Sequence, residues 1–419
     1  MRWFASISLL LLLLTPLKSN GQQLFSSATE YLKALEGSGI SNIKKGVDEL
    51  ILSIEDIEQQ SKVAALCFEY YYNSNVMGNE AVALHIADNY FLNKKLQWTD
   101  NEGFMMLQLF ADFNRESMIG NLAPELILYN NFGGENSTYA LETKPYGIKI
   151  IYFYDVNCTS CKSETPKLVE FLKEYPYNDL TFYAIYTQSD KEEWDEYIEL
   201  HFSEIDNPKV DIVHLWDPEV ESEFHKMYGV FTTPALFAID NSNTIIGRKL
   251  NGDVIEDIIN ISHLSSAENY IFFEELFKNI DNEQDILSVI NSLEVISQED
   301  EGAFRAIFFD LYHFLKDSET DLLREAAYYL SQKYILSDED FWSHNFVADC
   351  HLDIHFYEKT EDKNSSNRTI LYFYRLNEKR LLFAKQLEEL SSTTTNEFVK
   401  GIADSIINAI RNFNFQNLE

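Results

Sequence analysis

The sequence is poor in cysteine, glycine, proline and positive charge, and each shortage excludes a class of protein. Its 419 residues include only 4 Cys, too few for a disulfide scaffold in a chain of this length. With 15 Gly, 8 Pro and 45% hydrophobic residues, the chain is neither collagen-like nor wholly disordered. The 33 basic residues face 68 acidic ones, which gives a net charge of −35. This acidity argues against nucleic-acid binding and against electrostatic attachment to a membrane surface.

Long apolar stretches are also missing after the first residues of the chain. Residues 1–21 begin with a positive charge at Arg2, continue in an apolar run rich in leucine, and end in small residues before Gln22. This is the pattern of a secretory signal peptide, with cleavage expected after Gly21. The run is shorter than the ~20 residues of a membrane-spanning helix, so an uncleaved anchor is the less favoured alternative. We therefore expect an exported protein with no stable membrane span after cleavage.

Three regions follow the signal segment. Residues 22–121 have apolar residues three and four apart, which predicts a helical N-terminal domain. Residues 122–264 alternate short β-branched or aromatic runs with helical stretches, which predicts an α/β domain with a mostly parallel central sheet. Residues 265–419 are predicted to form a helical C-terminal domain. A weak likeness between residues 68–104 and 309–341 leaves open whether the two helical regions are duplicates or similar by coincidence.

Within the predicted α/β domain, strands and helices can be assigned from the residue pattern. The expected strands are residues 148–154, 180–186 and 235–240, with a further edge pair at 243–250. The expected helices are residues 165–174, 191–202 and 219–228.

A pair of cysteines lies where the first of these strands meets the first helix. Cys158 and Cys161 are separated by Thr159 and Ser160, which places both sulfurs within one helical turn, close enough for a short disulfide. A thiol at a helix N-terminus is favoured as the thiolate by the helix dipole and by free N–H groups. Such a thiolate attacks a substrate disulfide, and the second cysteine then resolves the mixed disulfide. A CxxC at a strand-to-helix junction is a stronger indication of redox chemistry than an isolated one.

Thr233 and Pro234 immediately precede the expected strand 235–240. A proline at a strand entrance opposite the cysteines is the expected site of a cis peptide bond. Because proline lacks an N–H, it also keeps the edge beside the disulfide open. An ordinary trans-proline at a strand start is the alternative.

These residues together resemble the thioredoxin-like superfamily, especially its exported TlpA/ResA-type branch. The segment at Ala123-Pro124, Lys162 and Pro166 match further positions of that branch. The resemblance implies an α/β thioredoxin-like domain with a central mixed sheet and flanking helices, between two mainly α-helical regions. It also implies thiol–disulfide oxidoreductase activity without a cofactor or metal. In this reading Cys158 is the nucleophile, Cys161 is the resolving cysteine, and Thr233 and Pro234 form the substrate-binding edge.

The region before the α/β domain resembles a helical domain of unknown function that precedes such modules in exported Bacteroidetes proteins. The likeness includes the residues 69–72, 85–91 and 120–124. It implies a periplasmic location in a bacterial envelope. The expected partners are other exported proteins that carry thiols or disulfides, together with a redox partner that recycles the CxxC.

Three positions depart from the usual pattern of the branch. Asn157 replaces an aromatic residue before the first Cys, Ser160 replaces a proline, and Tyr152 replaces a buried Asp or Asn. That buried group ordinarily helps to move the proton of the resolving thiol. The sequence leaves Tyr152, Glu142 or water as its substitute, and the direction of exchange stays open.

A second reading of the function belongs to a different class. In it the protein is a non-catalytic binding or scaffold protein whose CxxC is a structural disulfide. Cys67 and Cys350 are interpreted as structural thiols of the core. His344, His351 and His355 lie at helical spacings, and we interpret them as polar residues of an amphipathic helix rather than as a metal site.

Overall fold

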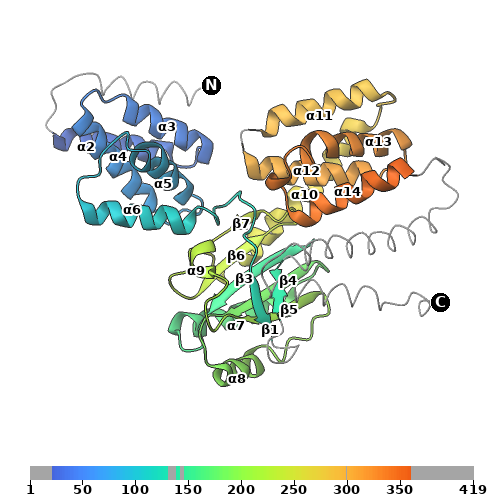
Figure 1. The fold of residues 1–419 in the computed structure, drawn as a ribbon, viewed down its shortest axis with the longest axis horizontal. Helices are drawn as coiled ribbons and strands as arrows, with labels where there is room; N and C mark the ends of the chain where they lie inside the picture. The colour runs from blue at the N-terminus through green and yellow to red at the C-terminus, as the bar shows by residue number, and fades with distance from the viewer. Residues whose placement is uncertain (1–20, 131–137, 142–145, 299, 360–419) are drawn as a thin grey trace, which may run out of the picture. The chain divides into compact units, whose positions relative to one another are not determined.

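The structure is a computed structural model in which residues 21–130, 138–141, 146–298 and 300–359 are described (Figure 1). The chain divides into two compact units, residues 1–314 and 315–419. Residues 1–20 of the predicted signal segment and the candidate proton carrier Glu142 lie outside the described residues.

The first unit begins with helices. They are α2 (Gly21–Leu35), α3 (Ile40–Leu52), α4 (Ile57–Tyr72), α5 (Glu80–Ile86), which continues as the π-helix η2 (Ala87–Leu92), and α6 (Asn101–Asn114). Asp56 and Asp100 are the N-caps of α4 and α6. Their carboxylates accept the free backbone N–H groups of Gln59 and Gly103. The helices enclose one apolar core, which includes Val47. This confirms the prediction of a helical region before residue 122.

A seven-stranded sheet follows, in the order β2-β1-β5-β4-β3-β6-β7. Its strands are β1 (Ile127–Asn130), β2 (Thr138–Ala140), β3 (Ile148–Tyr154), β4 (Leu180–Tyr186), β5 (Val210–Trp216), β6 (Ala235–Ile239) and β7 (Ile245–Gly247). The neighbours β3, β4 and β5 are parallel, whereas every other pairing is antiparallel. The sheet is therefore mixed, as the family resemblance implies. The prediction of a mostly parallel sheet is wrong, because β1–β2 and β6–β7 are joined by connections too short for a parallel crossover.

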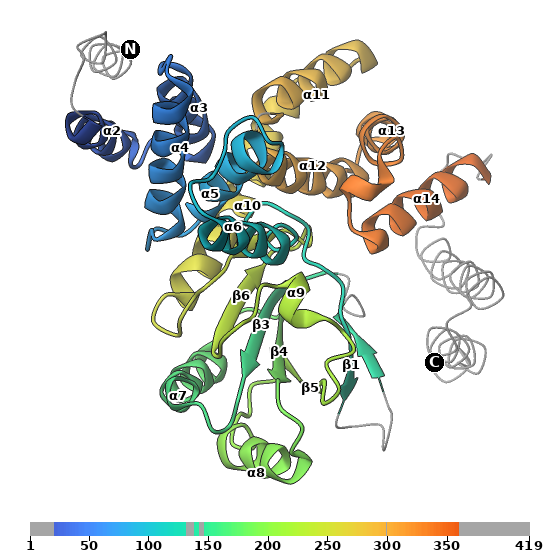
Figure 2. The ribbon, with the colours of Figure 1, turned by 60° about the vertical axis from the view of Figure 1, so that its left-hand side comes forward.

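Helices cover both faces of the sheet (Figure 2). They are α7 (Thr159–Glu174), α8 (Lys191–His201), the short α9 (Phe224–Met227) and α10 (Ile255–Phe277). Side chains of α7, α8 and α10 share a core with one face of the sheet, and Phe224 of α9 packs against the other. The strand β3 is buried along its whole length, and alternate residues of it enter the two cores.

The helix expected at residues 219–228 is much shorter than predicted. Val220 and Glu223 have left-handed φ angles of 57° and 53°, which an α-helix does not accommodate. The carboxylate of Asp217 instead accepts hydrogen bonds from the N–H groups of Glu221 and Ser222 and stabilises a turn. Only residues Phe224–Met227 are helical.

Beyond the sheet the chain is helical again. The elements are α10, α11 (Glu283–Ser297), α12 (Glu301–Lys316), α13 (Asp321–Leu330), the π-helix η4 (Ser331–Ile335), the 3-10 helix η5 (Glu339–Phe341) and α14 (His344–Lys359). α10 passes without a break through residue 264, where we predict a domain boundary. In both helical regions an α-helix continues as a π-helix, α5 into η2 and α13 into η4. This uncommon feature favours a duplicated unit over coincidence.

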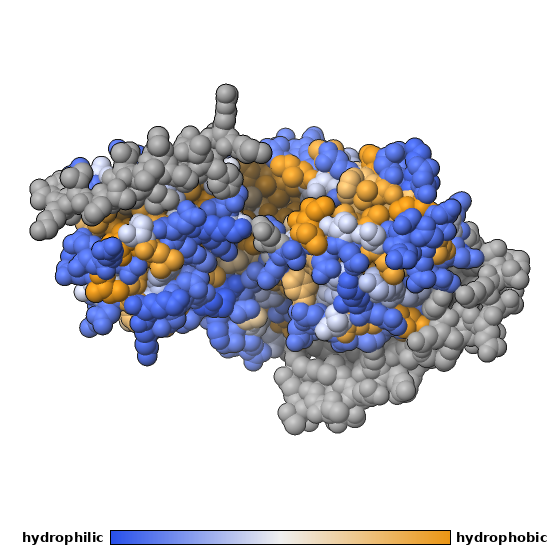
Figure 3. Space-filling model, turned by 90° about the horizontal axis from the view of Figure 1, so that it is seen from above, coloured by the Kyte–Doolittle hydropathy of each residue, from blue (hydrophilic) through white to orange (hydrophobic). Residues whose placement is uncertain are grey.

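Apolar side chains also reach the surface of the later helices. Ile271 of α10 and Val295 and Ile296 of α11 are each more than half exposed, at 63%, 64% and 74%. Figure 3 shows hydrophobic residues in patches among hydrophilic ones on the face seen from above. Among the described residues, no helix is long and apolar enough to cross a membrane.

Candidate active site

The loop between β3 and α7 presents Cys158 at the first turn of the helix. The backbone N–H of Cys158 donates to the carbonyl oxygen of Asp155 at 3.1 Å, which closes the turn after β3. Cys158 is the N-cap of α7, and its sulfur accepts the backbone N–H of Cys161 at 3.4 Å. The predicted placement of the CxxC at a strand-to-helix junction is confirmed. The structure adds that the sulfur itself occupies the position where a capping side chain satisfies a free N–H group.

Thr233 and Pro234 lie directly beside this sulfur. The thiol of Cys158 donates to the carbonyl oxygen of Thr233 across 3.1 Å, and the Thr233–Pro234 peptide bond is cis, as expected. The two segments meet because β6 runs antiparallel to β3, with Ala235 paired to Phe153. The end of β3 and the beginning of β6 therefore lie at the same edge of the sheet, and both cysteines and the Thr233–Pro234 segment are brought together there.

The two thiols of the pair have different surroundings. Burial tends to raise the pKa of Cys158, but hydrogen bonds from Cys161 and Thr233 outweigh it, so this pKa is below its ordinary value. Cys161 is completely buried, and burial raises the pKa of its thiol to about 11. Neither cysteine is in a disulfide in this structure. The partly exposed sulfur thus has the greater thiolate character, and the buried one is held as a thiol at neutral pH.

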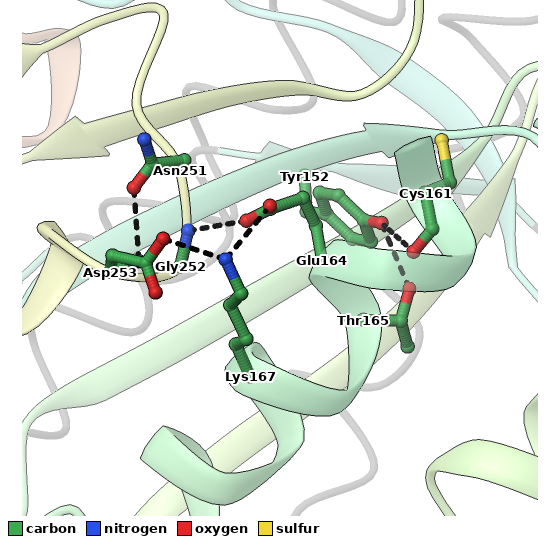
Figure 4. Close-up of polar contacts among 8 residues, drawn as sticks. All are labelled: Tyr152, Cys161, Glu164, Thr165, Lys167, Asn251, Gly252 and Asp253. Carbon is green, nitrogen blue, oxygen red and sulfur yellow. Dashed lines mark hydrogen bonds and ion pairs between the residues drawn. The ribbon is translucent and has the colours of Figure 1, made fainter. Parts of the chain in front are cut away.

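Hydroxyl groups lie next to Cys161 on its buried side (Figure 4). One of them belongs to Tyr152, the position at which the resembled branch has a buried Asp or Asn. The hydroxyl of Tyr152 is 2.9 Å from that of Thr165, which also accepts a hydrogen bond from Tyr197 at 2.8 Å. Tyr152 further donates to the backbone carbonyl of Cys161 at 3.5 Å. Burial raises the pKa of Tyr152 far above its ordinary value, so its hydroxyl stays protonated. These contacts fix the first turns of α7 with neutral groups.

Polar contacts also hold α7 to the loop that precedes α10 (Figure 4). Glu164 accepts the backbone N–H of Gly252 at 2.7 Å, and the ammonium of Lys167 lies 2.6 Å from Asp253. A side chain at position 252 would collide with Lys167, because its Cβ would lie 2.7 Å from the Cβ of that residue. Gly252 and these three charged residues therefore set the distance between α7 and this loop.

The remaining cysteines and histidines do not form a second site of this kind within the described part of the chain. Cys67 and Cys350 are buried and not in disulfides. His351 lies 2.7 Å from Glu339, and the side chain of His355 is outside the described residues. No three acidic, histidine or cysteine side chains gather as metal ligands among the residues that the structure describes.

Sequence reasoning missed some of the residues that shape the site. Strand β5 was not predicted, because Asp211 and His214 interrupt its apolar run. Thr165 and Tyr197 were not singled out as partners of Tyr152, since they come from two different helices. Asn157, which replaces the usual aromatic residue, donates its side-chain N–H to Glu193 at 2.8 Å and so joins the active-site loop to α8. None of these contacts leaves a periodic signal in the sequence.

A CxxC at the start of a helix, beside a cis-proline and on a mixed sheet with helices on both faces, defines a thioredoxin-like domain. Comparison with known families agrees with this fold: residues 119–248 match the AhpC/TSA family.

The comparison with solved structures gives matches of low sequence identity. The thioredoxin domain of a thiol-disulfide oxidoreductase from Bacteroides vulgatus is 19% identical, with a TM-score of 0.30, over 34% of this chain and 95% of that one. A thioredoxin-like protein from Bacteroides caccae is 14% identical, with a TM-score of 0.44, over 58% of this chain and 85% of its own. A thiol-disulfide oxidoreductase from Bacteroides fragilis is 19% identical, with a TM-score of 0.29, over 33% of this chain and 98% of its own. A comparison with curated proteins gave no match.

Proposed function

We propose that this protein is an exported thiol–disulfide oxidoreductase that exchanges disulfides with other exported proteins. The observation that carries the proposal is the position of the Cys158 sulfur. It caps α7, lies 3.1 Å from the Thr233 carbonyl, and is partly exposed, whereas its partner Cys161 is buried. This asymmetry suits a sequence of attack and resolution. The leader-like segment 1–21 supports export, and the bacterial periplasm is the proposed compartment.

The proposed reaction has two exchange steps. The Cys158 thiolate attacks one sulfur of a substrate disulfide, which forms a mixed disulfide and releases the other substrate sulfur as a thiolate that takes up a proton. Cys161 then loses its proton and attacks the sulfur of Cys158. This step forms the Cys158–Cys161 disulfide and releases the second substrate thiolate. The substrate disulfide is reduced by two electrons, and the cysteine pair is oxidised by two. A dithiol redox partner must reduce the pair again, and the reverse sequence oxidises a substrate.

Trapping of the intermediate tests this function. A Cys161→Ser variant should accumulate a mixed disulfide with a disulfide-bonded test peptide, because the resolving thiol is missing. A Cys158→Ser variant should form none. A Cys67→Ser variant, which alters a buried thiol outside the site, is the matched control and should turn over normally. If the wild-type protein exchanges with neither a dithiol nor a disulfide peptide, the redox function is wrong and the binding or scaffold reading takes its place.

A further inference from the structure

A pocket of about 470 Å³ lies next to the cysteine site, within the first unit of the chain. One wall comes from the N-terminal helices and includes Met106 and Leu109 of α6. The opposite wall comes from the segment around the cis peptide bond and includes Phe231 and Pro234. Pro234 follows the residue whose carbonyl accepts the thiol of Cys158. The pocket therefore continues from the proposed substrate-binding edge toward the helical region.

The walls are held together by direct contacts. The rings of Phe113 on α6 and Phe231 lie 4.7 Å apart, measured between their centroids. Gly229 fits closely against α6, because a Cβ there would lie 2.7 Å from the carbonyl oxygen of Phe113. Phe231 and Met106 are nevertheless 64% and 53% exposed. The pocket thus has packed walls and an apolar surface that a partner can reach.

The charge of this pocket is opposite to that of the protein. Its lining contains Arg248 and Lys249 but no acidic side chain. The whole chain, in contrast, has 68 acidic residues and a net charge of −35. Lys249 is neutralised by Glu80, whose carboxylate lies 3.1 Å from its ammonium. Arg248 forms no direct ion pair among the described residues, although the buried carboxylate of Glu80 also acts on its charge electrostatically.

Arg248 is a buried cation with incomplete hydrogen bonding. It is only 2% exposed, and its two terminal nitrogens donate to neutral groups, the Asn114 side-chain oxygen at 2.7 Å and the sulfur of Met118 at 3.1 Å. Its Nε has no hydrogen-bond partner in the described part of the chain. A buried guanidinium is normally paired with an anion, because the loss of its hydration is otherwise uncompensated. Glu80 pairs directly only with Lys249, so Arg248 lacks a directly bonded anion, and this points to an anionic ligand.

We propose that this pocket binds a segment of the substrate polypeptide that carries an apolar side chain and a carboxylate, with Arg248 as the counter-ion of the carboxylate. This inference rests on the proposed function, because the segment is bound while its cysteine reacts at Cys158. It makes the substrate class more specific: an acidic residue should lie within a few residues of the reacting cysteine. The general acidity of the protein should still disfavour strongly acidic partners at long range.

Paired disulfide peptides test the proposal. Each peptide has one cysteine joined by a disulfide to a small neutral thiol, which is the leaving group, together with apolar neighbours. The two peptides of a pair differ only in having Glu or Gln at the same position, one to four residues on one side of the cysteine. At one spacing, kcat/KM should be about tenfold or more higher for the Glu peptide, as expected for a charged hydrogen-bonded pair. An Arg248→Gln variant should bring this ratio close to one, and Arg248→Lys should retain part of it. Lys173→Gln removes a positive charge elsewhere on the same domain and should leave the ratio unchanged.

A second pair of variants covers the case in which Arg248→Gln does not fold. Met106→Glu places a negative charge in the exposed wall and should lower the preference for the Glu peptide by repulsion. Met105→Glu is the matched control, because Met105 is similarly exposed, at 56%, but does not line the pocket. If the two variants lower the preference equally, the effect comes from net charge and the proposed pocket is wrong.

A binding measurement separates this inference from the redox function. Peptides in which Ser replaces the reacting Cys are titrated against the protein by fluorescence anisotropy, with Glu and Gln at the selected spacing. Tighter binding of the Glu peptide that is lost in Arg248→Gln supports the pocket even if no exchange occurs. Equal binding and equal exchange of the two peptides overturn the pocket and leave the redox function standing.

Discussion

Cys67 and Cys158 are cysteines on helices of the same unit, yet their surroundings make them chemically different. Cys67 lies in the interior of α4, is completely buried in the core of the N-terminal helices, and has the pKa of its thiol raised by burial. Cys158 lies at the beginning of α7, is partly exposed, and has a lowered pKa. The position of a cysteine along its helix, together with burial, therefore decides whether it is a core residue or a nucleophile.

Cys161 falls between these two cases. It is as buried as Cys67, and burial raises the pKa of its thiol, but it lies one helical turn from Cys158. Its backbone N–H stabilises the sulfur of Cys158, whereas its own sulfur stays protonated at neutral pH. A buried thiol can act as a resolving group because it attacks a sulfur inside the protein and needs no access to solvent.

The largest expected contrast is in alkylation by iodoacetamide. The pKa of Cys158 is below the ordinary thiol value of 9.0, whereas that of Cys161 is about 11. Because only the thiolate reacts, Cys158 should be modified at pH 7 at least about a hundredfold faster than Cys161, and Cys67 should be inert in the folded protein. Lowering the pH through the pKa of Cys158 protonates its thiolate, so its rate should fall there.

Mass spectrometry of peptides after a short pulse of reagent between pH 5 and 10 gives the three rates. In guanidinium chloride the cysteines should become equally reactive, which shows that the contrast belongs to the fold. Half-maximal modification of Cys158 at or above pH 9.0, the ordinary thiol value, would contradict the role of the α7 N-terminus.

This contrast shows how much of the fold and of the site could be predicted from the sequence. The apolar periodicity and the strand-to-helix junction predicted β3, β4 and the position of the cysteine pair, because these depend on neighbouring residues. The contacts that tune the site were not predictable, since they join residues far apart in the chain. Asn157 meets Glu193 of α8, and Tyr152 meets Tyr197 through Thr165. The pairing of Arg248 with Asn114 likewise joins two regions that the sequence shows only as separate patterns.

The same comparison predicts that serine lowers the stability at one of these positions and hardly changes it at the other. Cys67→Ser places a hydroxyl in an apolar core and should lower the free energy of unfolding by about 1–3 kcal/mol. Cys158→Ser should change it by less than about 0.5 kcal/mol, because serine is a favourable N-cap and the site is partly exposed. Urea unfolding of the reduced proteins measures both. A loss of similar size in the two variants would show that the α7 N-terminus is as tightly packed as the helical core.

A smaller effect than that of Cys67→Ser is expected at Tyr152, the residue that replaces the usual buried carboxylate. Tyr152→Phe removes the hydroxyl but keeps the ring, which stacks on Tyr154 with centroids 5.3 Å apart. Thr165 keeps its hydrogen bond from Tyr197, so the free energy of unfolding should fall by only about 0.5–1.5 kcal/mol. Tyr197→Phe is the matched control and should cost a similar amount.

The rate of resolution separates a structural Tyr152 from a proton carrier. Its hydroxyl contacts Thr165 and the backbone carbonyl of Cys161, and it is held protonated by burial. We therefore expect the decay of a preformed mixed disulfide at Cys158 to change less than about threefold in Tyr152→Phe, and equally little in Tyr197→Phe. A fall of a hundredfold in Tyr152→Phe alone would make this hydroxyl the proton carrier. A small effect in both variants leaves Glu142 or water as the group that removes the proton from Cys161.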